Sequence, residues 1–410
     1  MKDSKPEGVK LIMHDLKVAL ISHEFPPFTI GGIASHCYDL AYSLSKKGIE
    51  TRVLCGTTAK SEKTIRLDPF LEVIRLPCLN FPPRYLWFQL FNHKKLCSLT
   101  SDCDIIHGVN PTASLALASH QKNSGKALIT THHLNELQTL KTYLLMPFSE
   151  LSLGDLAINV FPYPLNEFIE RMWFKYADRI VVPGYSTYEF MKRIYKRKYV
   201  EKISVVYNGI NFEKIEALAS NSQVADESNL SIVCFSRLVS HKGVAQFLSR
   251  SKPLFSDFPS VHMKIFGNGP LYSVLMKIIR KNNMVKNVSL MGHVPYEELI
   301  GHVSKAAVAV FPTFLEVGPF ISALEAMACK KPVVVFDLPF NREFIRHMKN
   351  GVMAKAGDMI DMISKIELLL SDKDLRVKIG ENAYKYVKEH HNWDTLVNKY
   401  IEIYDQALHS

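Results

Sequence analysis

The chain has 410 residues, which is too long for one ordinary hydrophobic core and predicts two or three domains. Its 47% hydrophobic and 22% charged residues are typical of a globular protein, so a disordered or fibrous chain is excluded. The formal net charge of +10 indicates an anionic partner. An acidic membrane surface or a phosphorylated small molecule would fit this charge. Nucleic acid is not expected, because no zinc-finger or aromatic RNA-binding signature is present.

The sequence contains neither a membrane span nor a secretory signal that we can identify. No apolar run reaches the ~18–20 residues needed to cross a bilayer, and residues 1–15 are charged without an apolar core. We therefore expect a soluble, cytoplasmic protein. The seven cysteines are scattered without a CxxC pair, which predicts neither a zinc site nor a disulfide framework.

Short apolar runs alternate with longer amphipathic stretches along the first half of the chain. A helical period through Cys37, Leu40, Ala41 and Leu44 follows the first run. The expected strands of this half are residues 17–22, 51–55, 71–76, 104–107, 127–131, 179–183 and 203–207. Such alternation predicts an α/β fold with parallel strands and crossover helices.

The apolar pattern breaks at residues 211–229, a small and polar stretch that predicts an interdomain linker. A second series of strands is then expected at residues 230–236, 261–266, 288–291, 307–311 and 332–336, and an apolar-faced helix at 393–408. The simplest interpretation is two parallel-sheet domains, residues 1–212 and 228–392, facing each other across a cleft. In such sheets ligands bind at the carboxyl ends of the strands, so the loops there should carry the chemistry.

Three loops carry the candidate residues. The first, residues 26–33, contains Gly31 and Gly32, which let a backbone approach a phosphate closely before a helix begins. The second, residues 235–243, contains Arg237 and Lys242, two cations that can neutralise a diphosphate leaving group. A tight turn and a solvated basic loop are the structural alternatives for these two loops.

The third loop, residues 311–328, places Glu316 after a buried strand and Glu325 inside an apolar helix. A carboxylate among apolar residues needs partners, and the two hydroxyls of a ribose would satisfy Glu325. The amides of Phe320, Ile321 and Ser322 at the helix start could hold a phosphate. A solvated Glu316 and a salt-bridged Glu325 are the alternative.

Taken in order, these segments resemble the retaining GT-B glycosyltransferases, specifically glycosyltransferase family 4 (glycosyl transferases group 1). The resemblance covers nearly the whole chain. It runs through Pro26-Pro27 with Gly31-Gly32, Asp104-Ile-Ile-His107, Thr130-Thr-His132, Asn208-Gly209, Ser236-Arg237-Leu238 with Lys242-Gly243, Phe266-Gly-Asn-Gly-Pro270, Gly292-His-Val294 and Leu324-Glu325-Ala-Met-Ala.

The resemblance implies two Rossmann-like domains, with helix 393–410 packing back on the first, acceptor-side domain. It also implies a UDP- or GDP-sugar donor bound by the second domain. Arg237 and Lys242 would hold the diphosphate, Glu325 the ribose, and the backbone at His293 and Val294 the base. Glu316 would contact the transferred sugar, His132 would lie at its reacting face, and Gly31 and Gly32 would close over the phosphates.

One spacing departs from the family, which places seven residues between its two glutamates. Glu316 and Glu325 have eight residues between them, and counting back from Glu325 puts Val317 at the first position. Either a bulge at Val317-Gly318-Pro319 lets Glu316 still reach the sugar, or that contact is lost.

Asp102-Cys103-Asp104 spells the DxD of metal-dependent sugar transferases, but it lies before a strand, away from the expected cleft. We therefore predict no metal requirement and no cofactor. His107 and His133 are more easily explained as structural residues than as catalytic ones.

The expected function is that of a retaining, metal-independent hexosyltransferase. Two alternatives remain at the level of sequence: a sugar-nucleotide 2-epimerase, and a catalytically inactive partner subunit. The sequence names neither sugar, base nor linkage.

The acceptor is the least constrained part of this prediction. Residues 143–165 are apolar with only two charges, and a basic stretch follows at residues 192–202. Two interpretations are open: a buried insert beside a solvated helix, or a peripheral attachment to the anionic inner face of a membrane, with a lipid-linked acceptor.

Overall fold

A computed structural model describes residues 16–27, 32–80, 84–110, 119, 125–133, 136–146, 151, 156, 160–220 and 230–409. The chain packs into two compact units. The first consists of residues 1–131, 172–180 and 401–410, and the second of residues 132–171 and 181–400. Residues 132–171 and 181–212, which the sequence analysis assigns to the first domain, thus group with the second unit. The boundary after residue 212 stays a prediction.

The first sheet has eight strands in the order β3-β4-β2-β1-β5-β6-β7-β8. Its strands are β1 (Lys17–Ser22), β2 (Glu50–Thr57), β3 (Lys63–Asp68), β4 (Leu71–Pro77), β5 (Ile105–Val109), β6 (Ala127–Thr131), β7 (Arg179–Val182) and β8 (Ile203–Val205). The pairs β1–β2, β1–β5, β2–β4 and β5–β6 are parallel. The edge strand β3 pairs antiparallel with β4, which the sequence analysis missed.

The helices that accompany these strands are α1 (Gly32–Lys46), α2 (Arg84–Leu99), α4 (Glu136–Leu145), α6 (Tyr163–Tyr176), α7 (Tyr185–Ile194) and α8 (Arg197–Val200). The four apolar residues that predict α1 are all fully buried, so this helix is confirmed. Apolar side chains of β1, β2, β4, β5 and β6 pack with α2 in one cluster that includes Ile21, Leu54, Phe88 and Ile106.

The second sheet has six strands in the order β11-β10-β9-β12-β13-β14. They are β9 (Ser231–Phe235), β10 (His262–Phe266), β11 (Val288–Gly292), β12 (Val308–Phe311), β13 (Val333–Phe336) and β14 (Val352–Ala354). All neighbouring pairs are parallel. The first five strands are those the sequence predicts, and β14 is added at the edge.

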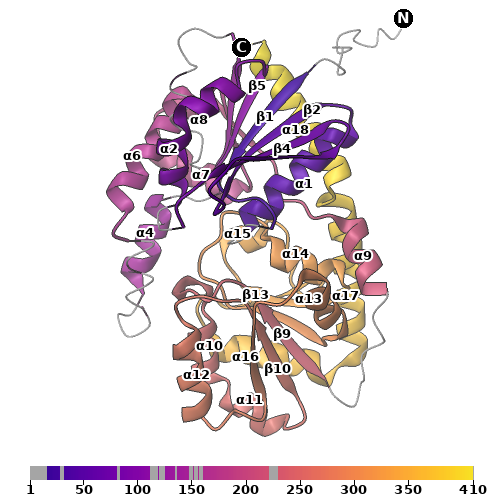
Figure 1. The fold of residues 1–410 in the computed structure, drawn as a ribbon. Helices are drawn as coiled ribbons and strands as arrows, with labels where there is room; N and C mark the ends of the chain where they lie inside the picture. Colours follow the sequence, from indigo (N-terminus) through magenta and orange to yellow (C-terminus); the bar gives the residue numbers. More distant parts are fainter. Residues whose placement is uncertain are drawn as a thin grey trace, which may run out of the picture. The chain divides into compact units, whose positions relative to one another are not determined.

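Helices cover both faces of this second sheet (Figure 1). They are α9 (Phe212–Ser220), α10 (Val244–Arg250), α11 (Lys252–Asp257), α12 (Tyr272–Lys281), α13 (Tyr296–Lys305), α14 (Ile321–Ala328), α15 (Pro339–Arg342), α16 (Met359–Ser371) and α17 (Lys373–His390). Successive strand residues alternate between the two faces. Ile232 and Cys234 pack with α10, α12 and α16, whereas Val233 and Phe235 pack with α9, α13, α14 and α17.

Helix α9 corrects the predicted linker. Phe212 and Ile215 are buried, so residues 212–220 form part of the second core instead of a polar connection. Residues 221–229 lie outside the described part of the chain. The last helix, α18 (Trp393–Leu408), begins in the second unit, and residues 401–410 group with the first. In the first unit, Tyr404 Oη lies 2.7 Å from Nδ1 of His107, whose side chain is fully buried. This contact gives His107 a structural role.

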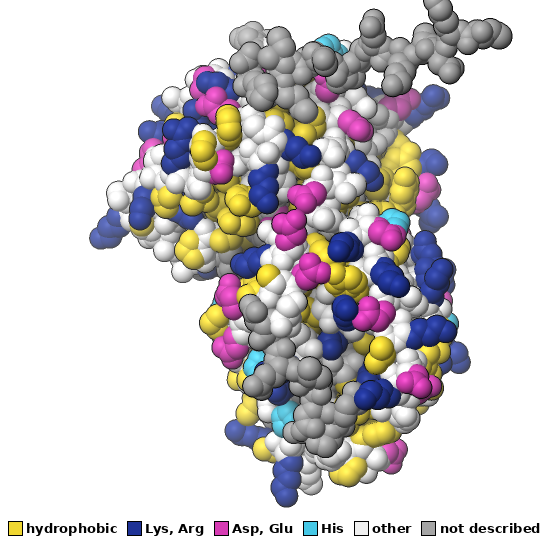
Figure 2. All heavy atoms as spheres, turned by 90° about the vertical axis from the view of Figure 1, so that its right-hand side faces the viewer, with side chains coloured by type: hydrophobic (Ala, Val, Ile, Leu, Met, Phe, Trp, Pro, Cys, Tyr) yellow, Lys and Arg dark blue, Asp and Glu magenta, His cyan; other side chains and the backbone are white. Residues whose placement is uncertain are grey.

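The net positive charge does not form one continuous basic patch on the face that Figure 2 shows. On the face that Figure 2 shows, lysine and arginine side chains are interspersed with aspartate and glutamate. Within the described residues, no helix combines the length and the apolar character needed to span a membrane.

Candidate functional site

The strand order of the second sheet marks where its ligand should bind. From β9 the chain builds outward through β10 and β11 on one side, then returns to build β12, β13 and β14 on the other. The loops after β9 and β12 therefore lie where the strand order reverses, at the carboxyl end of the sheet, which is the usual ligand position in such sheets. These are the β9 loop (residues 236–243) and the β12 loop (residues 312–320).

The β9 loop presents two cations and a histidine. Arg237 is exposed and Lys242 is half-buried. Residues Ser240–Lys242 form a single 3₁₀ turn that ends at Gly243, with φ of +70°. A Cβ atom at Gly243 would lie 2.0 Å from the carbonyl oxygen of Pro312, so only glycine fits against the β12 loop here.

His241 adds a neutral group between the two cations. Desolvation, together with the charges of Lys242 and Arg237, holds the pKa of His241 well below its usual range. Its Nδ1 lies 2.8 Å from the hydroxyl oxygen of Tyr143 in α4. Its carbonyl oxygen accepts hydrogen bonds from the amide of Phe314 at 2.9 Å and from Thr313 Oγ1 at 3.3 Å. The β9 and β12 loops are thus bonded to each other.

Glu316 lies on the β12 loop and forms a direct ion pair with Lys242. The Lys242 ammonium donates to Glu316 Oε1, and the two side chains are only 18% and 15% exposed. The structure therefore brings together two of the predicted site residues, despite the extra residue between Glu316 and Glu325.

The bulge predicted at Val317-Gly318-Pro319 is held by side chains from elsewhere in the second unit. Thr187 Oγ1 donates to the carbonyl of Val317 at 2.7 Å, and Asn208 Nδ2 donates to that of Pro319 at 2.9 Å. Between them, Gly318 has φ of +155°, and a Cβ there would lie 2.1 Å from the Pro183 carbonyl oxygen. Thr187 and Asn208 were not predicted to support this loop.

Helix α14 follows the β12 loop and positions Glu325. Its N-cap residue, Phe320, makes no side-chain bond to the first amides of the helix. Ile321 and Ser322 are half-buried there. Glu325 is 8% exposed, and Tyr296 Oη donates to its Oε1 at 2.9 Å. Sequence reasoning missed Tyr296, although it lies only two residues after Val294.

The remaining predicted residues of the donor side follow β11. His293 is exposed and Val294 is half-buried. Gly292, which ends the strand, has φ of +68°, and its carbonyl accepts from the Gly267 amide at 2.7 Å, so β10 and β11 end together.

His132 follows β6 and is deeply buried. Its amide donates to the Val181 carbonyl at 2.7 Å, and its Nε2 lies 3.7 Å from Oε1 of Glu170 in α6, a carboxylate that also accepts from Tyr195 Oη. Burial lowers the pKa of His132 to about 3, with a smaller effect from the neighbouring His133. The imidazole is therefore uncharged at neutral pH. In the first unit, Gly32 begins α1 and is exposed, whereas Gly31 lies outside the described residues.

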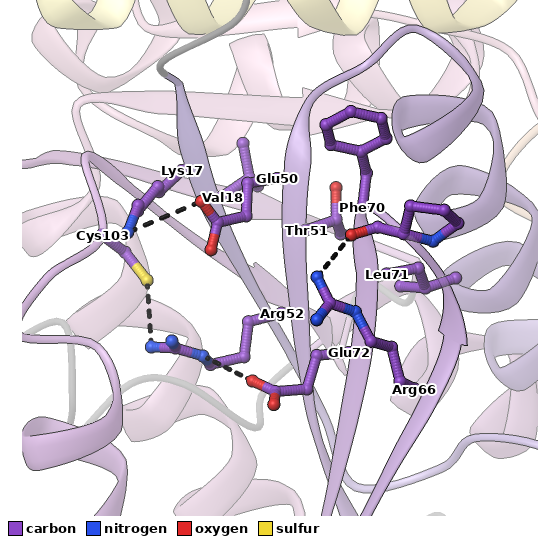
Figure 3. A pocket seen from close by; sticks show the side chains of 11 residues that line it. Lys17, Val18, Glu50, Thr51, Arg52, Arg66, Phe70, Leu71, Glu72 and Cys103 are labelled. Carbon is purple, nitrogen blue, oxygen red and sulfur yellow. Dashed lines mark hydrogen bonds and ion pairs between the residues drawn. The ribbon is translucent and has the colours of Figure 1, made fainter.

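A separate cavity of about 170 Å³ lies at the amino ends of β1, β2 and β4 (Figure 3). Most of its charged side chains are paired: Arg52 bonds to Glu72 and Asp102, and Lys17 pairs with Glu50. Arg66 donates to the carbonyl of Pro69. It lies at the end of the strands opposite to that used for ligands in this type of sheet. Asp102 of the DxD motif thus has a structural partner. No group of three acidic, cysteine or histidine side chains suited to a metal ion occurs in the described part of the chain.

Comparisons with known proteins agree with this architecture. A model of glycosyltransferase family 4 matches residues 30–214, and a model of glycosyl transferases group 1 matches residues 216–386. An uncharacterized glycosyltransferase of Methanocaldococcus jannaschii is 26% identical over 409 residues, covering 96% of this chain and 99% of that protein.

Two solved structures share the fold over nearly their whole length. Sucrose-phosphate synthase from Thermosynechococcus elongatus has a TM-score of 0.75 at 17% identity, covering 95% of this chain and 98% of that one. The Anabaena protein HepE, solved in complex with UDP-glucose, has a TM-score of 0.68 at 16% identity, covering 95% and 100%. The two-sheet fold and the matched models confirm the resemblance found in the sequence: the chain belongs to the GT-B glycosyltransferases of the family 4 type.

Proposed function

We propose that this glycosyltransferase moves a hexosyl group from a UDP- or GDP-sugar to an acceptor hydroxyl, with retention at the anomeric carbon and without a metal ion. The observation that carries the proposal is the ion pair of Lys242 and Glu316 on two bonded loops that follow strands β9 and β12, with Arg237 on the first loop and Glu325 on the helix after the second. The UDP-glucose bound to HepE supports this class of donor.

In this proposal the second unit holds the donor. Arg237 and Lys242 bind the diphosphate, assisted by the amides of Phe320, Ile321 and Ser322 at the start of α14. The buried Glu325 carboxylate, oriented by Tyr296, accepts from the ribose hydroxyls. The backbone at His293 and Val294 receives the base. Gly31 and Gly32, which the sequence analysis assigns to the phosphates, are the remaining donor-binding residues of this proposal.

The chemical step is driven by charge stabilisation. As the bond to the anomeric carbon breaks, negative charge grows on the leaving diphosphate, and Arg237 and Lys242 stabilise it more strongly than in the ground state. The acceptor attacks from the same face, and the leaving phosphate takes its proton, so the configuration is retained. His132, uncharged because its pKa is about 3, contacts the sugar hydroxyls without adding a positive charge beside the developing cation.

A transfer assay with a panel of UDP-, GDP- and ADP-hexoses tests this proposal, with product configuration read by NMR. We expect turnover of a UDP- or GDP-sugar, an α-linked product from an α-linked donor, and full activity in EDTA. Formation of an epimerised sugar nucleotide without acceptor would instead identify an epimerase. Binding of donors without any transfer would identify an inactive partner subunit.

For the acceptor we propose a lipid-linked sugar reached from an anionic membrane surface. Leu144 of α4, Phe161 in the turn before α6 and Phe168 within α6 are 70%, 71% and 61% exposed. The same unit carries exposed basic residues in and around α7 and α8, namely Lys192, Arg193, Lys196, Arg197 and Lys198. Tyr195, which lies among them, donates a hydrogen bond to Glu170 of α6. Apolar side chains next to cations are suited to the interface of an acidic bilayer.

Sedimentation with liposomes of acidic and neutral lipids tests this attachment. We expect pelleting with acidic liposomes at low salt, and its loss at high salt and in the Phe161→Ser/Phe168→Ser variant. A chain that stays in the supernatant at low salt would favour a soluble acceptor.

A further inference from the structure

Lys242, one of the two cations assigned to the donor diphosphate, already has an anionic partner. Its ammonium donates to Glu316 Oε1 in a close ion pair, and both side chains are largely shielded from water. Pairs at this depth are screened much less than surface pairs. The positive charge that should attract a diphosphate is therefore largely neutralised by the chain itself.

The pair is set by two constrained loops, so it is not a chance surface contact. Gly243, the residue after Lys242, lies so close to the Pro312 carbonyl that no side chain fits there. The His241 carbonyl accepts hydrogen bonds from Thr313 Oγ1 and from the Phe314 amide. On the other side of Glu316, the Val317 carbonyl accepts from Thr187. Both backbones are thus fixed within a few residues of the pair.

A carboxylate and a diphosphate cannot share Lys242 without repulsion. A lysine ammonium is a compact charge with three donor hydrogens, so it can change partner by a small rotation of its side chain. The bound diphosphate would place its negative charge within a few ångströms of Glu316, and at that distance two anions repel strongly in a partly buried site.

We propose that Glu316 is an internal counter-anion that the donor diphosphate displaces from Lys242 and that returns to Lys242 to expel the nucleoside diphosphate product. This inference rests on the proposed function. Displacement frees the Glu316 carboxylate to accept a hydrogen bond from a hydroxyl of the transferred sugar. Once the sugar has left on the acceptor, that bond is lost, and Glu316 again competes with the product for Lys242.

Glu316→Gln tests the exchange, because it keeps the shape of the side chain and removes its charge. Isothermal titration with UDP and GDP should show affinity for the preferred nucleotide at least ~10-fold tighter than in the wild-type protein, since one repelling charge is removed. Product inhibition by the same nucleotide should strengthen by a similar factor, and turnover should fall. Glu316→Asp keeps the charge and should bind the nucleotide within about threefold of wild type.

Glu381→Gln is the matched control. The Glu381 carboxylate lies 3.0 Å from the Lys330 ammonium, and both side chains are about half exposed. Lys330 follows α14 and Glu381 lies in α17, so neither belongs to the β9 loop or the β12 loop. Replacement of Glu381 removes the same net charge and should leave nucleotide affinity unchanged. A gain in Glu381→Gln equal to that in Glu316→Gln would mean that net charge alone is responsible, and would overturn the exchange.

Further outcomes separate the inference from the proposed function. If wild type binds UDP or GDP, Arg237→Ala abolishes that binding, and Glu316→Gln binds no more tightly than wild type, the exchange is wrong while the donor site stands. If neither nucleotide binds the wild-type protein at millimolar concentration, both the donor site and the exchange are wrong. Thermal melts with and without nucleotide verify that each variant is folded, and the nucleotide should raise the melting temperature of Glu316→Gln more than that of wild type.

Discussion

Gly243→Ala should disrupt the donor site through the backbone alone. Gly243 has φ of +70°, and an added Cβ would lie 2.0 Å from the oxygen and 2.9 Å from the carbon of the Pro312 carbonyl. Because Cβ contacts below 3.0 Å essentially do not occur, the β9 and β12 loops must move apart by about 1 Å in a closely packed region. The left-handed backbone costs alanine ~1 kcal/mol, and the displacement adds roughly 2 kcal/mol.

Gly357 offers a control that separates these two contributions. Its φ is +75°, but a Cβ there would meet only a ring carbon of Phe314, at 3.8 Å. Gly357→Ala should therefore lose only the backbone contribution of ~1 kcal/mol. The difference between the two variants isolates the contact between Gly243 and Pro312.

Thermal unfolding measures this difference. For a folded unit of about 150–250 residues, 1 kcal/mol corresponds to ~2–4 °C in melting temperature. We expect a fall of roughly 6–12 °C for Gly243→Ala and of about 2–4 °C for Gly357→Ala. Nucleotide affinity should fall only in Gly243→Ala, because Lys242 precedes the displaced residue. Equal melting temperatures of the two variants would refute the steric reasoning.

Three further predictions concern single side chains. Arg237→Ala should leave the melting temperature unchanged, because Arg237 is exposed, and should lower kcat/KM at least ~100-fold, with partial recovery in Arg237→Lys. Tyr296→Phe removes the hydrogen bond to Glu325; UDP or GDP affinity should fall ~5-fold, and the affinity of the 2′-deoxy nucleotide should change less, whereas equal losses would make Tyr296 purely structural. His391→Gln tests pH dependence: burial lowers the pKa of His391 to about 4. The unfolded state therefore binds this proton below pH ~6.5 while the folded state does not, so the free energy of unfolding falls by up to ~1.4 kcal/mol per pH unit as pH drops from 6.5 towards 4. Urea unfolding at several pH values between 7 and 5 measures how the free energy of unfolding changes with pH. This change should be smaller in the variant, by the amount that corresponds to the uptake of about one proton.

The central strands were predictable because parallel strands are buried on both faces. Runs such as Val333–Phe336 have no polar residue and are too short for helices, so their type is unambiguous. The edge strand β3 was missed because most of its residues are exposed, and its sequence KTIRLD carries charges at half of its positions. Strand β14 has only three residues. Helix α9 was mistaken for a linker because its small residues, Ala217, Ala219 and Ser220, resemble those of a polar connection.

The donor side of the candidate site was predictable to the level of its loops, and not beyond. Arg237, Lys242 and Glu325 stand out because their charges follow or interrupt apolar runs. Contacts such as Tyr296 to Glu325 or Tyr143 to His241 join residues that are 29 and 98 positions apart. They depend on how helices pack on the sheet, which no local pattern reports.

The spacing of Glu316 and Glu325 illustrates how a local departure is absorbed by the fold. The additional residue lies in a segment whose two flanking carbonyls, of Val317 and Pro319, are each held by a side chain from a distant part of the second unit. Gly318, between them, takes a backbone conformation that a side chain would forbid. Because the extra length is confined to this anchored bulge, Glu316 still reaches Lys242 on one side, and α14 still begins at Ile321 on the other. The longer spacing therefore does not by itself argue for an inactive protein, since the carboxylate occupies the cationic site that the proposed chemistry requires.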